Sequence, residues 1–286
     1  MTKGKRKVDI LVLSDIHLGT YGCHAKELFQ YLSSIKPKVV VLNGDIIDIW
    51  QFSKNYFPKS HIKVIRHLMG WIARGTKTYY ITGNHDELLR KFAGLKIGSL
   101  QVLNKMVLET PEGQRAWIFH GDVFDVTMQH AKWLARAGAI GYDTLILINR
   151  MANFLSEKIL RKGKLSFSKK IKNNVKSAVI FINDFEVTAA DIGISNNYDY
   201  VVCGHIHQPE IKKISNDKGS ILYLNSGDWI ENLTALEYHT GDWQLYHYNK
   251  NDFSVNPADL VTENEPDLDQ RRLFDSLLQE FNLMKP

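Results

Sequence analysis

Short polar motifs rich in Asp, His and Asn recur along the chain, and each follows a run of apolar residues. They are D-x-H with Asp15 and His17, G-D with Asp45, G-N-H-D with Asn84, His85 and Asp86, H-G-D with His120, and G-H-x-H with His205 and His207. Side chains two residues apart project to the same side of extended backbone, so D-x-H and H-x-H each present two ligands to one point. Mixed oxygen and imidazole ligands suit borderline divalent metals rather than Ca or Mg, which prefer all-oxygen shells.

Seven of these side chains are candidate metal ligands, and that number indicates two ions. They are Asp15, His17, Asp45, Asn84, His120, His205 and His207. A carboxylate between two ions can bridge them about 3.5–4 Å apart, a geometry that activates hydroxide and clamps a phosphoryl group for in-line attack. Asp45 is the candidate bridge, although a lone Asp after a strand is more often a simple cap. We expect Mn as the metal, with Fe, Co or Zn as alternatives.

The apolar runs predict the elements that position these ligands. The continuous run that opens residues 39–48 suits a strand buried on both faces, as in a parallel sheet between helices. Helices are expected over residues 25–35, closed by Pro37, over 61–74, stopped by Gly75, and over 268–283 near the end of the chain. The other strands we expect cover residues 8–13, 78–82, 116–119, 200–203 and 221–224, with a closing hairpin over 234–248. Most motifs therefore stand at the carboxyl ends of strands, the usual place for chemistry in α/β sheets.

The composition limits the class of protein. The chain has 286 residues, 44% apolar content and a formal charge of +5, which fits an anionic partner such as phosphate, nucleic acid or an acidic membrane surface. Its two cysteines, Cys23 and Cys203, form no disulfide framework and favour a reducing compartment. No uncharged run approaches 18 residues and the basic start lacks the features of a signal peptide. We expect a cytoplasmic protein that is soluble or peripheral on a membrane.

The chain divides into a core, an insertion and an extension. Residues 1–124 and 198–250 carry the strands and motifs, residues 125–197 change to a basic helical pattern, and residues 251–286 form a C-terminal extension with the expected helix. The insertion is either a solvated cap or a lid with an apolar side for acyl chains or membrane and a basic side for phosphates. The candidate substrate contacts in it are Trp133, Arg136, Arg150, Lys169, Lys170 and Lys172.

The five motifs, in this order and each after a strand pattern, resemble those of the calcineurin-like metallophosphoesterase superfamily over residues 8 to about 248. The resemblance implies an α/β fold, a four-layer α/β/β/α sandwich with the helical insertion as a cap. It implies that Asp15, His17 and His207 hold one metal, that Asn84, His120 and His205 hold the other, and that Asp45 bridges them.

The same resemblance gives roles to residues beside the ligands. His85 resembles the family's catalytic histidine, which would protonate the leaving oxygen or stabilise charge on the phosphoryl group. Asp86 is expected to orient it. For Asp48 and Asp122, hydrogen bonding to ligand histidines and local roles in turns are both open.

Three details narrow the resemblance to the UDP-2,3-diacylglucosamine diphosphatase group: H-G-D before a helical insertion, G-H-I-H-Q-P, and S-G-D-W after the last ligand. That group cleaves a lipid-linked pyrophosphate to UMP and diacylglucosamine 1-phosphate in lipid A synthesis, at the inner face of the bacterial inner membrane. Its best-known members carry arginine where this chain has His85. The oligomeric state stays open.

Other functions use the same features. A general phosphodiesterase or phosphatase would act on a nucleotide or another phosphoester with the same metals. A nuclease would track a phosphate backbone with the basic insertion, but no aromatic-plus-basic strand motif for nucleic acid is present. A non-catalytic scaffold that docks on membranes would be expected to have lost ligands, and here none is missing.

Overall fold

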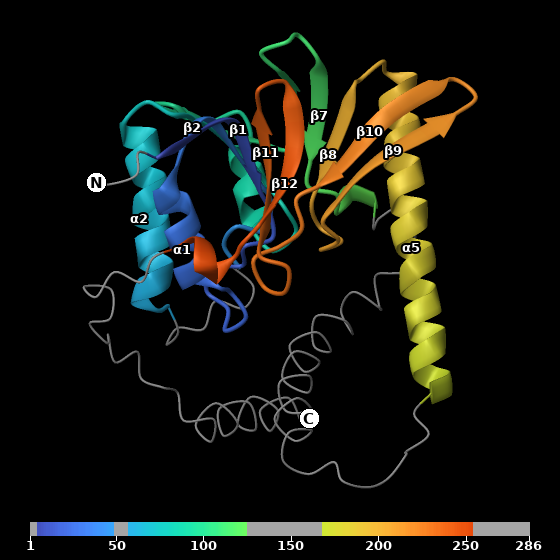
Figure 1. The fold of residues 1–286 in the computed structure, drawn as a ribbon, viewed down its shortest axis with the longest axis horizontal. Helices are drawn as coiled ribbons and strands as arrows, with labels where there is room; N and C mark the ends of the chain where they lie inside the picture. The colour runs from blue at the N-terminus through green and yellow to red at the C-terminus, as the bar shows by residue number, and fades with distance from the viewer. Residues whose placement is uncertain (1–4, 49–56, 125–167, 254–286) are drawn as a thin grey trace, which may run out of the picture.

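A computed structural model of the chain describes residues 5–48, 57–124 and 168–253. Two sheets pack face to face, with α1 and α2 on the outer side of one sheet and α5 on the outer side of the other (Figure 1). This arrangement confirms the predicted α/β/β/α sandwich.

The larger sheet has seven strands, in the order β12-β11-β1-β2-β3-β5-β4. Its strands are β1 (Arg6–Leu13), β2 (Ile35–Asn43), β3 (Lys77–Ile81), β4 (Lys96–Ile97), β5 (Leu100–Leu103), β11 (Thr234–His239) and β12 (Asp242–His247). Strands β1, β2, β3 and β5 run parallel. In β1, Ile10 and Val12 pack between the two sheets, whereas Leu11 and Leu13 pack under the helices. The near-continuous apolar pattern of β1 follows from this burial on both faces.

The smaller sheet has five strands, in the order β6-β7-β8-β10-β9. Its strands are β6 (Lys105–Glu109), β7 (Arg115–Phe119), β8 (Tyr200–Cys203), β9 (Glu210–Asn216) and β10 (Gly219–Asn225). Strands β7, β8 and β10 run parallel, so their carboxyl ends share one edge of the sheet.

Helices cover the outer faces of both sheets. Helices α1 (Ala25–Ser34) and α2 (Lys59–Ala73) bury Leu28, Leu32, Leu68 and Trp71 against the seven-stranded sheet. The two short helices η1 (Glu87–Phe92) and η2 (Lys250–Asp252) complete the described elements. The prediction that Pro37 closes the first helix is wrong: the backbone is already extended at Ile35, and Pro37 lies inside β2 opposite Val8.

Helix α5 (Ser168–Ser195) forms the fourth layer. Its buried residues Phe185 and Ala189 pack with Val201, Cys203 and Tyr223 of the five-stranded sheet. The end of the predicted insertion therefore contributes to the core. The expected helix over residues 268–283 lies outside the described residues, and no helix among the described residues is long and apolar enough to span a membrane.

Candidate metal centre

The candidate ligands gather where strands of both sheets end. Asp15 and His17 follow β1, Asp45 follows β2, and Asn84 follows β3, all in the seven-stranded sheet. The ligands from the five-stranded sheet are His120, directly after β7, and His205 and His207, directly after β8.

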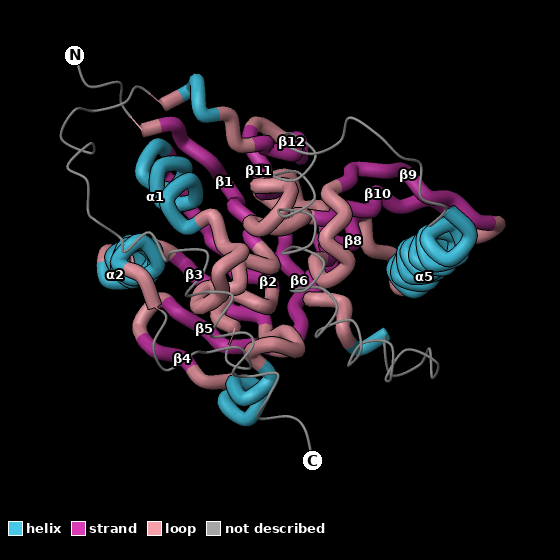
Figure 2. Tube along the Cα trace, turned by 90° about the horizontal axis from the view of Figure 1, so that it is seen from below, coloured by secondary structure: helices cyan, strands magenta, loops and turns pink. Residues whose placement is uncertain are grey.

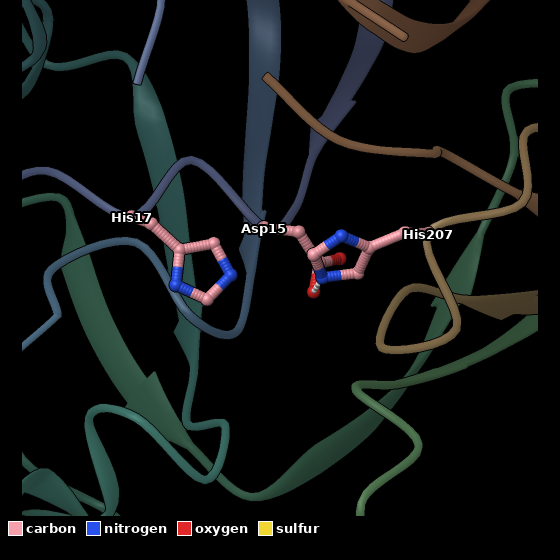
Figure 3. Close-up of side chains that lie close together, drawn as sticks. All are labelled: Asp15, His17 and His207. Atoms are coloured by element: carbon pink, nitrogen blue, oxygen red, sulfur yellow. Dashed lines mark ion pairs between the residues drawn. The ribbon is translucent and has the colours of Figure 1, made fainter. Parts of the chain in front are cut away.

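The first group consists of Asp15, His17 and His207, whose ligand atoms all lie within 4.8 Å of one another. Figure 3 shows these three side chains converging from the loops after β1 and β8. His207 Nε2 lies 3.2 Å from Asp15 Oδ1. This is the set expected to hold one metal.

The second group consists of Asp45, His120 and His205, which meet the same distance criterion. Asp45 Oδ2 lies 3.2 Å from His120 Nε2 in this group and 4.0 Å from His17 Nε2 in the first. One carboxylate oxygen therefore lies between imidazoles of both groups, as a bridging ligand requires.

Four of the predicted ligand atoms are buried polar atoms without a hydrogen-bond partner among the described residues. They are Asp15 Oδ1, His17 Nε2, Asn84 Oδ1 and His120 Nε2. Asp15 Oδ1 and His120 Nε2 each lie 3.2 Å from an ion-pair partner, His207 and Asp45 respectively. His17 Nε2 and Asn84 Oδ1 have no ion-pair partner that close among the described residues, and because leaving a buried polar atom unsatisfied costs about 1–3 kcal/mol, these two indicate a missing partner. Carboxylate, imidazole and amide groups are the ligands expected for a divalent transition metal. The residues of the candidate site therefore fit such an ion.

Hydrogen bonds to the remaining polar atoms fix the orientation of these ligands. His120 Nδ1 lies 2.9 Å from the carbonyl oxygen of Asn43, to which it can only donate, and this contact leaves Nε2 as the metal-binding nitrogen. Asp15 Oδ2 accepts from the backbone N–H of His205 at 3.0 Å, and Asp45 Oδ1 accepts from that of His85 at 2.8 Å. Each carboxylate thus has one oxygen on the backbone and the other beside an imidazole.

The backbone around the ligands is unusual. Five ligand residues have a left-handed backbone, with φ of 50° at Asp15, 53° at His17, 54° at Asp45, 68° at His205 and 53° at His207. Outside glycine this conformation costs on the order of 1 kcal/mol or more and persists where the surroundings enforce it, often at functional sites.

Glycines beside the ligands make room for them. A Cβ at Gly83 would lie 2.2 Å from Asp45 Oδ1, and one at Gly44 would lie 2.3 Å from His120 Nδ1. Both distances are too short for any side chain. The glycine in each motif therefore accommodates a ligand from a neighbouring strand.

Charge pairing governs the titration of the metal-free ligands. Burial alone would raise the pKa of Asp15, but the neighbouring His207 imidazole outweighs it and lowers that pKa to about 2. Burial opposes protonation of His207, yet Asp15 raises the pKa of His207 to about 9. His120 similarly holds the pKa of Asp45 well below its usual value against the effect of burial. Without metal, the imidazolium forms neutralise the buried carboxylates.

Asp48 orients His85. Its Oδ2 lies 2.8 Å from His85 Nδ1 and 3.3 Å from His17 Nδ1, and the carboxylate is buried. Of the two roles open for Asp48, the structure supports hydrogen bonding to a ligand histidine. Burial opposes ionisation of Asp48, but its hydrogen bonds with His17 and His85 lower its pKa below the usual range, so the carboxylate accepts from both rings.

The expectation that Asp86 orients His85 is wrong. The Asp86 carboxylate accepts from the backbone N–H of Gly83 at 2.6 Å and of Ile46 at 3.1 Å, and from the Tyr80 hydroxyl at 2.6 Å. It fixes the turn that carries Asn84 and does not bind the His85 ring. Asp122, in turn, forms an ion pair with Arg90.

The S-G-D-W motif supports the first ligand group, a role that its sequence alone does not predict. Asp228 Oδ1 accepts from the backbone N–H of Ile230 at 2.7 Å, which shapes the turn. Asn232, three residues after the motif, donates from Nδ2 to the carbonyl oxygen of His207 at 2.9 Å. The backbone N–H of Trp229 donates to the carbonyl oxygen of Asp15 at 3.1 Å. The only sign of this role in the sequence is that a polar motif follows the last candidate ligand.

The predicted substrate contacts remain untested. Trp133, Arg136 and Arg150 lie outside the described residues. Lys169, Lys170 and Lys172 belong to α5, but their side chains are also outside the described part of the chain. Their proposed role stays a prediction.

Comparison with known proteins agrees with this geometry. Residues 8–209 match the family model described as calcineurin-like phosphoesterase. The UDP-2,3-diacylglucosamine hydrolase of Blochmanniella pennsylvanica (strain BPEN) is 25% identical over 227 residues, which cover 76% of this chain and 86% of the relative. The protein with the same name from Aliivibrio fischeri (strain MJ11) is 24% identical over 258 residues, covering 85% of this chain and 99% of the relative.

The family match covers more than half of the chain and includes every candidate ligand, and the described structure brings six of the seven together in the groups Asp15/His17/His207 and Asp45/His120/His205. A third group, His17/Asp48/His85, joins the first through His17. The fold, the ligand types and the buried unsatisfied atoms all agree with it. The chain therefore belongs to the calcineurin-like phosphoesterase family and is a metal-dependent hydrolase of phosphate esters.

Proposed function

We propose that this phosphoesterase hydrolyses the pyrophosphate of UDP-2,3-diacylglucosamine, or of a close lipid-linked analogue, to UMP and a lipid 1-phosphate. Water adds across one P–O–P linkage, so each product keeps one phosphate monoester. The observation that carries the proposal is the complete ligand set in a chain whose relatives, matched over most of their length, are named UDP-2,3-diacylglucosamine hydrolase.

The metal sites follow the two ligand groups. Asp15, His17 and His207 would hold one divalent ion, and Asn84, His120 and His205 the other, with Asp45 shared. When bound, two such ions polarise phosphoryl oxygens and lower the pKa of water. Mn is our first choice of metal.

The protein itself supplies positioning and proton transfer. Because His85 Nδ1–H donates to Asp48, Nε2 carries a proton only in the imidazolium form of the ring. Burial lowers the pKa of His85, but the hydrogen bond with Asp48 and the nearby carboxylates raise it above its usual value, which favours that form. The Nε2–H would then protonate the leaving oxygen or hydrogen-bond the phosphoryl group. His85 also donates its backbone N–H to Asp45, which fixes the ring near the shared ligand.

A lipid-linked substrate implies a location. We propose that the protein works in the cytoplasm, peripherally on the inner face of the inner membrane, where an anionic surface would attract its net positive charge. Nucleic acid is not the expected partner.

Product analysis tests this function. Mn-loaded protein is incubated with UDP-2,3-diacylglucosamine and the products are identified by mass spectrometry, with Asp45→Ala as the inactive control. We expect UMP and the lipid 1-phosphate. No turnover, in a preparation that still hydrolyses an aryl phosphodiester, would contradict the substrate and leave the metal chemistry in place.

That second outcome would favour a general phosphodiesterase acting on another phosphoester. One feature of the sequence points in its direction: His85 stands where the best-known lipid A diphosphatases carry arginine. An imidazole has fewer N–H groups than a guanidinium for binding a diphosphate and can transfer a proton that arginine retains.

A further inference from the structure

Four exposed large apolar side chains lie in one short segment that follows His85 in the chain. They are Leu88, Phe92, Leu95 and Ile97, which we call the apolar ridge, and their exposed fractions are 55%, 47%, 43% and 58%. Single exposed apolar residues are ordinary, but four within one short segment indicate a surface that contacts something apolar.

Cations are interleaved with the apolar ridge. Lys91 and Lys96 are exposed, and Lys91 Nζ lies 5.6 Å from the centroid of the Phe92 ring. Arg90 is paired with Asp122, and Glu87 is the exposed acid at the start of the segment. Over residues 88–98 the side chains are therefore apolar, small or cationic, with no acid among them.

Two contacts tie the first part of the apolar ridge to turns that carry candidate ligands. Helix η1 begins two residues after His85, and the backbone N–H of Leu89 donates to the carbonyl oxygen of Asp86 at 2.9 Å. The ion pair between Arg90 and Asp122 joins η1 to the turn that follows ligand His120. Seen from below, β4 lies at the outer edge of the seven-stranded sheet next to β5 (Figure 2).

We propose that the apolar ridge, together with Lys91 and Lys96, is a docking surface for an anionic lipid bilayer. Apolar side chains interleaved with lysines suit the boundary between headgroups and acyl chains, since the former enter the acyl region and the latter bind anionic headgroups. The biological purpose rests on the proposed function, because docking here would bring the metal centre to a lipid-linked pyrophosphate.

Vesicle binding tests the docking surface without requiring turnover. The full chain is sedimented with vesicles of phosphatidylcholine, with and without phosphatidylglycerol. We expect binding to the anionic vesicles and a partition coefficient that falls roughly tenfold or more in Lys91→Gln/Lys96→Gln. Leu88→Ser/Ile97→Ser should lower it on the order of tenfold at unchanged charge.

The controls match these changes elsewhere on the surface. Lys213→Gln/Lys218→Gln removes two charges from β9 and its hairpin, and Val107→Ser removes an apolar side chain that is 43% exposed on β6. Both should bind vesicles like the parent chain. An equal loss of binding in the controls would overturn the proposal, because net charge or general hydrophobicity would then account for binding.

Two further readouts distinguish membrane docking from burial of the apolar ridge within the protein, and docking from catalysis. If the apolar ridge is covered by another part of this chain, Leu88→Ser/Ile97→Ser will lower the melting temperature and leave vesicle binding intact, and the proposal falls. Hydrolysis of a soluble aryl phosphodiester should be unchanged in all these variants. Ridge-dependent vesicle binding without turnover of UDP-2,3-diacylglucosamine would support the docking surface and contradict the proposed function. Turnover of UDP-2,3-diacylglucosamine without ridge-dependent vesicle binding would support the proposed function and contradict the docking surface.

Discussion

The two sheets contribute different chemistry to one metal centre. The seven-stranded sheet supplies every oxygen ligand, Asp15, Asp45 and Asn84, with a single imidazole. The five-stranded sheet supplies only imidazoles. In both ligand groups a carboxylate from the larger sheet lies 3.2 Å from an imidazole of the smaller one.

Neither sheet can therefore form either proposed site alone. Hydrogen bonds between the sheets hold the two sets in register: Asn43 Nδ2 donates to the carbonyl oxygen of Phe119 at 3.0 Å, and His120 Nδ1 returns a bond to that of Asn43 at 2.9 Å. The candidate metal centre is therefore part of the interface between the sheets, and its geometry depends on the contacts that pack them together.

The largest expected effect comes from removing one ligand on each side of this interface. Asp45→Ala and His120→Ala should each lower turnover of an aryl phosphodiester by about 10³-fold or more, because metal stabilisation of the transition state is worth several kcal/mol. Asp9→Asn is the control and should keep activity, because Asp9 lies within β1, away from the carboxyl end that Asp15 follows. If one variant keeps its activity while the other loses it, the two sheets do not contribute equally to catalysis.

The next largest effects distinguish the roles of His85, Asp48 and Asp86. His85→Ala should lower kcat about 10²–10⁴-fold with metal retained, as for loss of a general acid. Asp48→Asn should lower kcat about 10–100-fold, as for a residue that orients others. Asp86→Asn should instead lower the free energy of unfolding by about 1–3 kcal/mol, because its buried carboxylate holds a turn. Kinetics, metal content and thermal unfolding should be measured on all three variants. A larger loss of kcat in Asp86→Asn than in Asp48→Asn would contradict the roles given to these two carboxylates.

Metal removal should act on the interface as well as on turnover. A ligand bound at 100 times its Kd stabilises the folded state by about 2.7 kcal/mol, so chelation should lower the melting temperature by several degrees. Amide hydrogen exchange should rise first at the ends of β7 and β8, where the imidazoles are anchored. Exchange that rises only in distant parts of the described chain would contradict a centre that joins the sheets.

The smallest expected effect is the release of protons when metal binds. The pKa of His207 in the metal-free protein is about 9, so its imidazole is protonated at neutral pH and must lose that proton to bind metal. Metal affinity should rise with pH up to about 9. The stability of the metal-free fold depends on pH in the opposite direction from the metal affinity. Because the pKa of His207 is raised from 6.5 to about 9, the stabilisation by its pair with Asp15 is complete below pH 6.5 and is lost as the pH rises through about 9. Calorimetry of metal binding in buffers of different ionisation enthalpy measures the released protons; no release would refute the assignment.

Much of this centre was predictable from local patterns. Apolar runs located the strands that end at Asp15, Asn84 and His120, because a strand buried on both faces leaves a distinct sequence pattern. The resemblance to a known family implied the four-layer architecture and the set Asp15, His17 and His207, which lie together in the structure. The placement of Asn84 with His120 and His205 stays a prediction.

Other features depend on contacts that no local pattern encodes. The contact of Asp48 with His85, and of Asp86 with the Gly83 backbone, follows from which rings and amides come near each carboxylate after the strands pair. Strands β4, β5, β6 and β9 were not predicted. Of these, β4, β6 and β9 are edge strands whose exposed or half-buried residues lack a buried pattern, and β5 has only four residues. Strand order is equally long-range: β11 pairs with β1 across more than 200 residues.

The spread of the ligands along the chain sets the order of events during biosynthesis. His205 bonds to Asp15 across 190 residues, so the ribosome must deliver both sheets before either ligand group can close. A nascent chain that ends after β5 carries the carboxylates but none of the imidazoles of the smaller sheet. Strand β11, which pairs with β1, emerges later still. Neither candidate metal site can therefore close before β8 and the histidines that follow it have been synthesised, so metal binding is expected late in the formation of the fold.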